Sequence, residues 1–120
     1  HTGNEPATVL ACEAVDQALG KIVEAILAVG GALVVTADHG NAEEVKNLTT
    51  GEMDKEHSTN PVPLVVVSRE LEGIKAPSGD VTNGDLSLIP PIGMLADVAP
   101  TVLKLLQIPQ PPDMTGNPLI

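Results

Sequence analysis

The sequence predicts an α/β fold in which helices flank a sheet of buried strands. A long amphipathic pattern at residues 5–29 ends directly before an uninterrupted apolar run at 32–36. A second apolar run follows at 62–67, and a second helical pattern follows at 97–107. Helical patterns that alternate with continuous apolar strands are typical of layered proteins with a parallel sheet. We therefore expect parallel buried strands at 32–36 and 62–67, flanked by the two helices.

The first predicted helix begins after Asn4, which can cap it, and Pro6 is tolerated in its first turn. Apolar residues then recur at steps of three and four, which is typical of an amphipathic helix, and the glycine pair 30–31 ends it. Cys12 lies within this apolar pattern and is the only cysteine of the chain. We interpret it as a buried small hydrophobic residue, with no partner for an internal disulfide.

The two apolar runs have the pattern of strands buried on both faces, because neither alternates with polar residues. Between them, residues 41–60 are polar and aperiodic, so we expect a long loop, a feature that is often functional. Two strands are too few for a stable parallel sheet. We therefore expect the chain to contribute to a larger sheet and to leave part of its apolar surface uncovered.

The C-terminal third combines an irregular segment with a short helix. Residues 69–94 are rich in Gly, Pro, Asp and Ser, and they predict an excursion outside the core. The helix at 97–107 is predicted to be capped by Asp97 and to hold Pro100 in its first turn. The sequence begins on His1 without an initiator methionine, so we expect residues 1–120 to be a single-domain fragment of a longer protein.

The composition limits the partners of the chain. Its 120 residues are 42% hydrophobic but contain no Phe, Trp or Tyr, so any core must consist of Leu, Val, Ile and Ala. A formal net charge of −10 disfavours nucleic acids and anionic membranes, whose phosphates would be repelled, and favours divalent cations. No apolar stretch reaches the roughly 20 residues of a membrane span, and no signal-peptide pattern opens the chain. These features predict a cytoplasmic protein.

The strongest chemical signal follows the first apolar run, where Asp38 and His39 stand side by side. Loops that leave the carboxyl ends of strands in α/β proteins converge on a crevice. Imidazole and carboxylate groups are ligands of transition-metal ions, and the remaining histidines, His1 and His57, can join the same site. The alternative is an ordinary turn, because Asp, Gly and Asn are common loop residues.

Four blocks of the sequence stand in the same order as in one enzyme family. The blocks are His1–Asn4, Thr36–Glu43, His57–Leu64 and Leu95–Leu103, and the closing Met114–Gly116 also matches. Over essentially its whole length the chain resembles the C-terminal portion of cofactor-independent (2,3-bisphosphoglycerate-independent) phosphoglycerate mutase, in the alkaline phosphatase superfamily. The resemblance implies a partial alkaline-phosphatase-like layered fold and the C-terminal part of the metal-binding phosphatase-like domain.

The resemblance also implies a reaction and a ligand set. The family interconverts 3- and 2-phosphoglycerate in glycolysis through a phosphoserine intermediate and two divalent metals, usually manganese, although other divalent metals are possible. By resemblance, His1 and His57 bind one metal, and Asp38 and His39 bind the other. The nucleophilic serine belongs to a part of the family outside this chain, so we expect no catalytic residue here and no activity from the isolated fragment. The serines of this chain are interpreted as solvated loop residues: Ser58, Ser68, Ser78 and Ser87.

Two other functions remain open. One is a different metalloenzyme of the superfamily, such as a phosphopentomutase or a phosphatase, with the same Asp-His-Gly turn. Asn60–Pro63 and Ala99–Thr101 favour the mutase over it. The other is a non-catalytic module that kept the fold. The expected partners are the small-molecule phosphoglycerate substrate and, through uncovered apolar surface, further copies of the chain.

Overall fold

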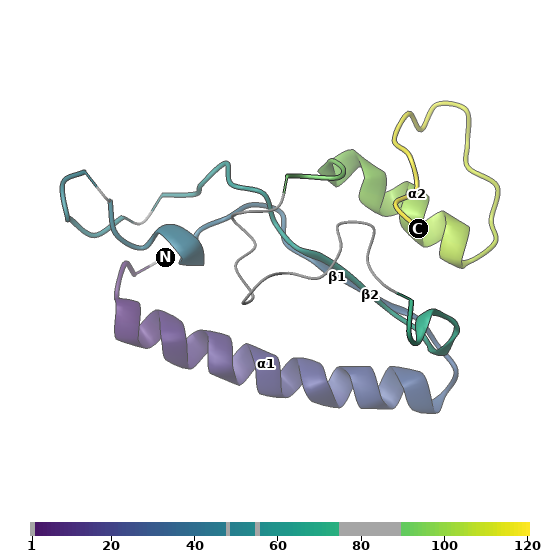
Figure 1. Cartoon of the computed structure of the whole chain (residues 1–120), viewed down its shortest axis with the longest axis horizontal. Coiled ribbons are helices and arrows are strands. Elements are labelled where there is room, and N and C mark those ends of the chain that lie inside the picture. The colour runs from purple at the N-terminus through teal and green to yellow at the C-terminus, as the bar shows by residue number, and fades with distance from the viewer. Residues whose placement is uncertain (1, 48, 55, 75–89) are drawn as a thin grey trace. The chain divides into compact units, whose positions relative to one another are not determined.

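The computed structural model describes residues 2–47, 49–54, 56–74 and 90–120 (Figure 1). The chain divides into two compact units, with the boundary between Glu70 and Leu71. The elements of the chain, in order, are α1 (Glu5–Ala28), β1 (Leu33–Thr36), η1 (Ala42–Glu44), β2 (Leu64–Val67), η2 (Arg69–Leu71), η5 (Leu95–Asp97) and α2 (Val98–Leu105).

Helix α1 begins and ends as the sequence predicts. The side-chain oxygen of Asn4 accepts a hydrogen bond from the Ala7 amide at 3.0 Å, and Pro6 lies in the first turn. Gly30 adopts a φ of 71°, the left-handed conformation that ends helices at glycine. The prediction that Cys12 is buried is wrong, because its side chain is exposed.

The apolar face of α1 is largely uncovered. Val9 is 53% exposed and Leu10 is 66% exposed, and no residue of the helix is buried. The reason is length: at 24 residues the helix is about 36 Å long, whereas a four-residue strand spans only about 13 Å. A sheet of two such strands cannot cover the helix, and Figure 1 shows α1 to be much longer than β1 and β2.

Strands β1 and β2 occupy the predicted positions, but they pair antiparallel. Leu33 pairs with Val67, and Thr36 pairs with Leu64. The predicted parallel pairing is therefore wrong. A parallel pair needs a long crossover, usually a helix, and the described residues between these strands contain only the three-residue η1. The apolar runs predicted the strands correctly but carried no information about their direction.

The predicted burial of the strands is also wrong. Both strands are mostly half-buried, and Val65 is 49% exposed. In the described part of the chain no Ala, Val, Leu, Ile or Met side chain is buried, and the most enclosed side chains are those of Pro100 and Thr101. The helix and strand content of an α/β protein is confirmed. The parallel layered fold is not confirmed, and the described residues contain no buried aliphatic core.

The long loop between the strands is partly ordered, because the part that follows β1 pairs with the part that precedes β2. We call these two parts the arms of the loop. Isolated antiparallel bridges join Gly40 to Ser58 and Lys46 to Met53. The loop therefore continues the direction of the β1–β2 hairpin beyond the strands. This pairing places the segment that follows β1 next to the segment that precedes β2.

Two contacts tie α1 to the rest of the first unit. The ammonium group of Lys46 lies 2.9 Å from a carboxylate oxygen of Glu5, at the beginning of the helix. At its end, Nε of Arg69 donates to the carbonyl oxygen of Leu27 at 3.1 Å. The helix is thus attached to the long loop by one end and to η2 by the other.

In the second unit, α2 lies within the predicted range 97–107 but ends two residues earlier, and it places Pro100 in its first turn, where it is buried. The predicted capping of this helix by Asp97 is wrong, because its side chain makes no capping hydrogen bond to α2. The carboxylate instead accepts the backbone N–H groups of Met94 and Asn117, each at 2.8 Å. These two bonds lower the pKa of Asp97, which is only 4% exposed.

The hydroxyl group of Thr101 makes a second buried connection in this unit. It donates to the backbone carbonyl of Asp97 at 2.7 Å and accepts the amide of Leu119 at 3.0 Å. The C-terminal segment is therefore held against the start of α2 by polar contacts. Within the described residues, no helix combines the length and hydrophobicity that a membrane span requires.

Candidate metal centre

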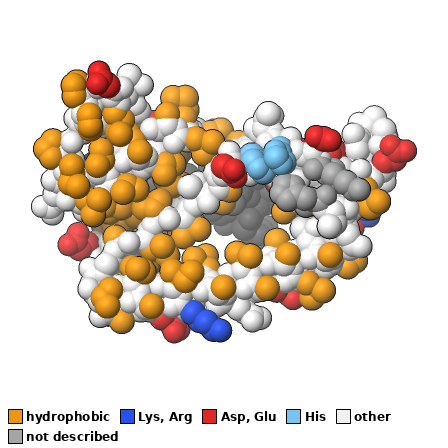
Figure 2. All heavy atoms as spheres, turned by 180° about the vertical axis from the view of Figure 1, so that it is seen from behind, with side chains coloured by type: hydrophobic (Ala, Val, Ile, Leu, Met, Phe, Trp, Pro, Cys, Tyr) orange, Lys and Arg blue, Asp and Glu red, His pale blue; other side chains and the backbone are white. Residues whose placement is uncertain are grey.

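The structure brings together two of the three histidines. His39 follows β1 and His57 precedes β2, and the bridge between Gly40 and Ser58 holds their two arms level. The imidazole rings stack, with centroids 3.7 Å apart and planes inclined by 15°. In Figure 2 pale-blue histidine side-chain atoms form one patch at the surface. His1, the third predicted histidine, lies outside the described residues.

Asp38 lies next to this pair. Its Oδ1 is 3.6 Å from Nε2 of His39, and its side chain is 89% exposed, compared with 32% for His39. Nδ1 of His39 lies 3.1 Å from the carbonyl oxygen of Gly40. Because a carbonyl oxygen can only accept, this contact requires a proton on Nδ1 and leaves the lone pair of the neutral ring on Nε2, which faces Asp38.

Asp38 and His39 have the spacing of two ligands of one metal ion. Two ligands bonded to a tetrahedral ion at about 2.1 Å lie about 3.4 Å apart. The separation of 3.6 Å between Oδ1 of Asp38 and Nε2 of His39 is close to that value. The donor chemistry, one carboxylate and one imidazole, also suits a divalent transition metal.

The stacked rings of His39 and His57 are not arranged as two ligands of one ion. The nitrogen lone pairs of an imidazole lie in the plane of its ring, so a bound metal lies in that plane as well. Two nearly parallel rings 3.7 Å apart cannot direct their lone pairs at one point.

The ligands present are too few to complete either site. Among the residues that the structure describes, no group of three or more His, Cys, Asp or Glu side chains is arranged to hold a metal ion. Asp38 and His39 would supply two ligands to one ion, and His57 would supply one to another. Both ions would need further ligands from outside this set.

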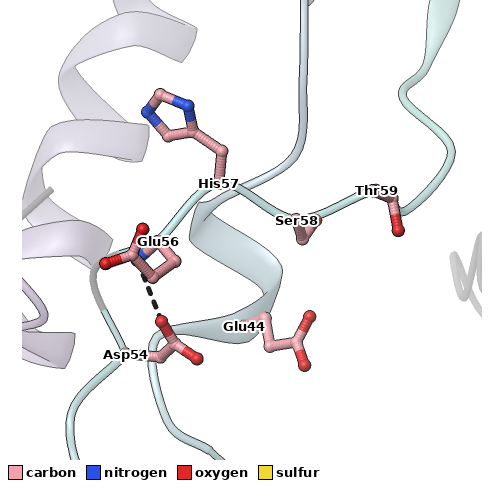
Figure 3. Close-up of a pocket in the computed structure, with 6 residues that line it drawn as sticks. All are labelled: Glu44, Asp54, Glu56, His57, Ser58 and Thr59. Carbon is pink, nitrogen blue, oxygen red and sulfur yellow. Dashed lines mark hydrogen bonds between the residues drawn. The ribbon is translucent and has the colours of Figure 1, made fainter.

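A cavity of about 260 Å³ lies beside the histidines but does not contain the predicted ligand group. His57 is the only predicted ligand among its lining residues, which are Glu44, Asp54, Glu56, His57, Ser58 and Thr59. The imidazole of His57 points away from the carboxylates of Glu44 and Asp54 (Figure 3). Asp54 accepts the amide of Glu56 at 2.9 Å. The stacked pair, rather than this cavity, is therefore the candidate metal centre.

The sequence analysis missed Glu43, which connects the two arms. Its Oε2 accepts the Asn41 amide at 2.8 Å, and its Oε1 accepts the Ser58 hydroxyl and, at 3.2 Å, the Asn60 side-chain amide. The hydrogen bond from Ser58 is the largest cause of the lowered pKa of Glu43, against the opposing effect of burial. Glu43 belongs to the block at Thr36–Glu43, but its partners 15 and 17 residues away leave no local sequence signal.

The interpretation of the serines as solvated loop residues needs correction. Ser58 is half-buried and donates to Glu43, and the hydroxyl oxygen of Ser68 is buried without a hydrogen-bond partner among the described residues. Ser78 and Ser87 lie outside the described residues. The structure thus uses Ser58 to join two loops, a role that its polar neighbourhood in the sequence did not indicate.

Asp38, His39 and His57 lie together on paired loops next to the strand ends, and their carboxylate and imidazole groups form a candidate metal site. The sequence of residues 1–110 matches the family described as the Metalloenzyme superfamily, and the chain belongs to that family. Membership implies the use of a divalent metal.

The particular relatives are phosphoglycerate mutases. The chain is 48% identical over its whole length to the 2,3-bisphosphoglycerate-independent phosphoglycerate mutase of Rhodopseudomonas palustris, and 46% and 45% identical to the enzymes of that name from Nostoc punctiforme and Agrobacterium fabrum. It covers 20% of the first relative and 21% of the other two, so it spans about a fifth of their length. The resemblance to the C-terminal region of this family is confirmed.

Proposed function

We propose that this chain forms part of the metal centre of a phosphoglycerate mutase that interconverts 3- and 2-phosphoglycerate through a phosphoserine intermediate. The stacking of His39 on His57, with Asp38 beside them, is the observation that carries the proposal. Whole-length identity of 48% to a relative with this name supports the choice of reaction. The chain would act in the cytoplasm on a small-molecule substrate.

In this proposal the ligands divide between two divalent ions, with manganese as the expected metal. Asp38 and His39 belong to one ion, as their 3.6 Å spacing supports, and His57 belongs to the other together with His1. The bound ions would supply positive charge at the phosphoryl oxygens and favour deprotonation of the hydroxyl nucleophile.

The residues of this chain have supporting tasks in that reaction. The carbonyl oxygen of Gly40 fixes the tautomer of His39, and the exposed carboxylate of Asp38 offsets part of the charge of a cation. The serine that carries the phosphoryl group is expected from another part of the protein. We therefore expect no mutase activity from the 120-residue chain alone, because without that serine there is no covalent carrier.

The proposal is tested with the gene that encodes this chain, expressed in full. Conversion of 3-phosphoglycerate, followed by coupling to enolase, should be lost on chelation and restored by manganese. His39→Ala should reduce the rate by about two orders of magnitude or more, whereas Glu24→Gln, an exposed charge change on α1, should not. Activity that is indifferent to a chelator would contradict the proposal.

The same preparation separates the mutase from the other functions. Turnover of a pentose phosphate or of p-nitrophenyl phosphate, with none of phosphoglycerate, would identify a different metalloenzyme of the superfamily. Binding of manganese without turnover of any of the three substrates would identify a non-catalytic module. Each of these results would overturn the mutase assignment.

A further inference from the structure

The carboxylate of Glu43 contacts both arms that carry the stacked histidines. Its Oε2 binds the amide of Asn41, two residues after His39. Its Oε1 binds the hydroxyl of Ser58, the residue directly after His57. One side chain therefore joins the two arms within two residues of each imidazole.

The contact between the arms leaves no room for a side chain at position 40 unless Glu43 or Ser58 moves. Gly40 is buried, and a Cβ atom added there would overlap the carboxylate of Glu43 and the hydroxyl of Ser58. The amide of Ser58 also donates to the carbonyl of Gly40 at 2.9 Å. The glycine, the serine and the glutamate thus form one packed unit, which has little freedom to change the distance between the arms.

We propose that Glu43 is a positioning residue, which fixes the separation of His39 and His57 by clamping the two arms that carry them. The consequence for metal binding rests on the proposed function, since it assumes that these imidazoles are ligands. The clamp itself rests only on the hydrogen bonds and packing around Glu43. Groups that orient metal ligands typically change metal affinity or activity by about 10- to 100-fold when they are removed.

The clamp requires a carboxylate and not merely a polar side chain. Both oxygens of Glu43 accept hydrogen bonds, from Asn41 on one side and from Ser58 and Asn60 on the other. In Glu43→Gln an amide NH₂ group replaces one oxygen, so at least one of these donors would face another donor. The neighbouring Glu44 offers a matched control, because among the described residues its carboxylate accepts a single hydrogen bond, of 3.3 Å, from the Asn60 side-chain amide.

The test compares Glu43→Gln with Glu44→Gln in the full gene product. In the metal-free protein, histidine labelled with ¹³C at Cε1 reports the ring stack through upfield ring-current shifts, assigned with His39→Gln and His57→Gln. In Glu43→Gln the shifts of both rings should move toward those of unstacked histidine. Manganese titration should show a dissociation constant raised by about 10- to 100-fold. Glu44→Gln should remain close to wild type in both measurements.

Further variants keep the result interpretable. If Glu43→Gln unfolds, Ser58→Ala removes one bond of the clamp and should give a smaller shift in the same direction; unchanged ring shifts in that variant would overturn the proposal. Unchanged ring shifts in a folded Glu43→Gln protein, or equal effects of both glutamate variants, would also overturn it. Failure of the wild-type protein to bind manganese would overturn the proposed function alone, because the ring shifts are read without metal.

Discussion

Glu43 and Asp97 are two carboxylates that hold chain segments together in different ways. Glu43 is exposed and is bound by side-chain groups of Ser58 and Asn60 in addition to one backbone amide. Asp97 is 4% exposed and is bound by two backbone amides, of Met94 and Asn117. Backbone donors around Asp97 fix the path of the chain, whereas side-chain donors around Glu43 fix the spacing of two functional arms.

The comparison predicts that the two carboxylates affect different properties. Loss of Asp97 would leave two backbone N–H groups without their acceptor in a largely enclosed place, and unmet buried donors are costly. Loss of Glu43 would leave groups that water can reach. Substitutions around Asp97 should therefore lower stability most, and substitutions around Glu43 should change the site before they change stability.

The largest effect on stability is expected for Asp97→Ala. Removal of the acceptor for Met94 and Asn117 should release the C-terminal segment and lower the melting temperature by about 10 °C. Thermal unfolding followed by circular dichroism measures this, with Asp113→Ala, an exposed aspartate of the same unit, as the control. Equal melting temperatures for Asp97→Ala and Asp113→Ala would contradict the prediction, because they would show that the enclosed carboxylate of Asp97 stabilises the fold no more than an exposed one.

A smaller effect on stability and a larger effect on the site are expected for Gly40→Ala. The added methyl group must displace Glu43 or Ser58, which should cost about 1–3 kcal/mol in the free energy of unfolding and weaken manganese binding. Gly20→Ala is the matched control, because a Cβ at that position in α1 meets no atom within 4 Å. That control should stabilise the helix by about 0.5–1 kcal/mol. Denaturant titrations of both variants would give the two values, and loss of stability in both would contradict the packing argument.

The stability that Asp97 contributes should depend on pH. The pKa of Asp97 is lowered from 3.8, so its contribution to stability is complete above that value and is lost as pH falls through the lower pKa of the folded state. Hydrogen exchange at the amide of Asn117 should therefore be slower in wild type than in Asp97→Asn at neutral pH. The difference should shrink in acid below pH 3.8. A difference that stays constant throughout this range would exclude the ionised carboxylate as its cause.

The smallest effect is expected for Lys46→Ala, which removes the ion pair with Glu5. Both side chains are more than half exposed, at 59% and 58%, and exposed pairs contribute little because water and salt screen them. The pair lowers the pKa of Glu5 chiefly through its hydrogen bond with Lys46. The melting temperature should change little, and any change should disappear at high salt. A large change that persists at high salt would indicate a further role for Lys46.

Features with local causes were predictable from the sequence. The cap at Asn4, the helix end at Gly30 and the placement of Pro100 each depend on residues within one or two helical turns. The positions of both strands followed from apolar runs. The adjacency of Asp38 and His39 was equally local, so it identified the candidate site without a structure.

Features that depend on distant partners were not predictable. The direction of β2 depends on how residues 37–63 return, and continuous apolar runs report burial rather than direction. The inward carboxylate of Asp97 depends on Asn117, 20 residues later. The contact of Glu43 with Ser58 spans 15 residues. No periodicity within a single element carries these contacts.

Because α1 is attached at both ends, its length relates two points on either side of the hairpin to each other. Its beginning is tethered to Lys46 in the long loop, and its end is tethered to Arg69 just beyond β2. If β2 slipped along β1, the distance between these two tethering points would change, while a helix of about 36 Å would keep its length. One tether would then be strained or broken. The contacts at the two ends of α1 thus fit a single register of the hairpin, the one that sets His39 beside His57.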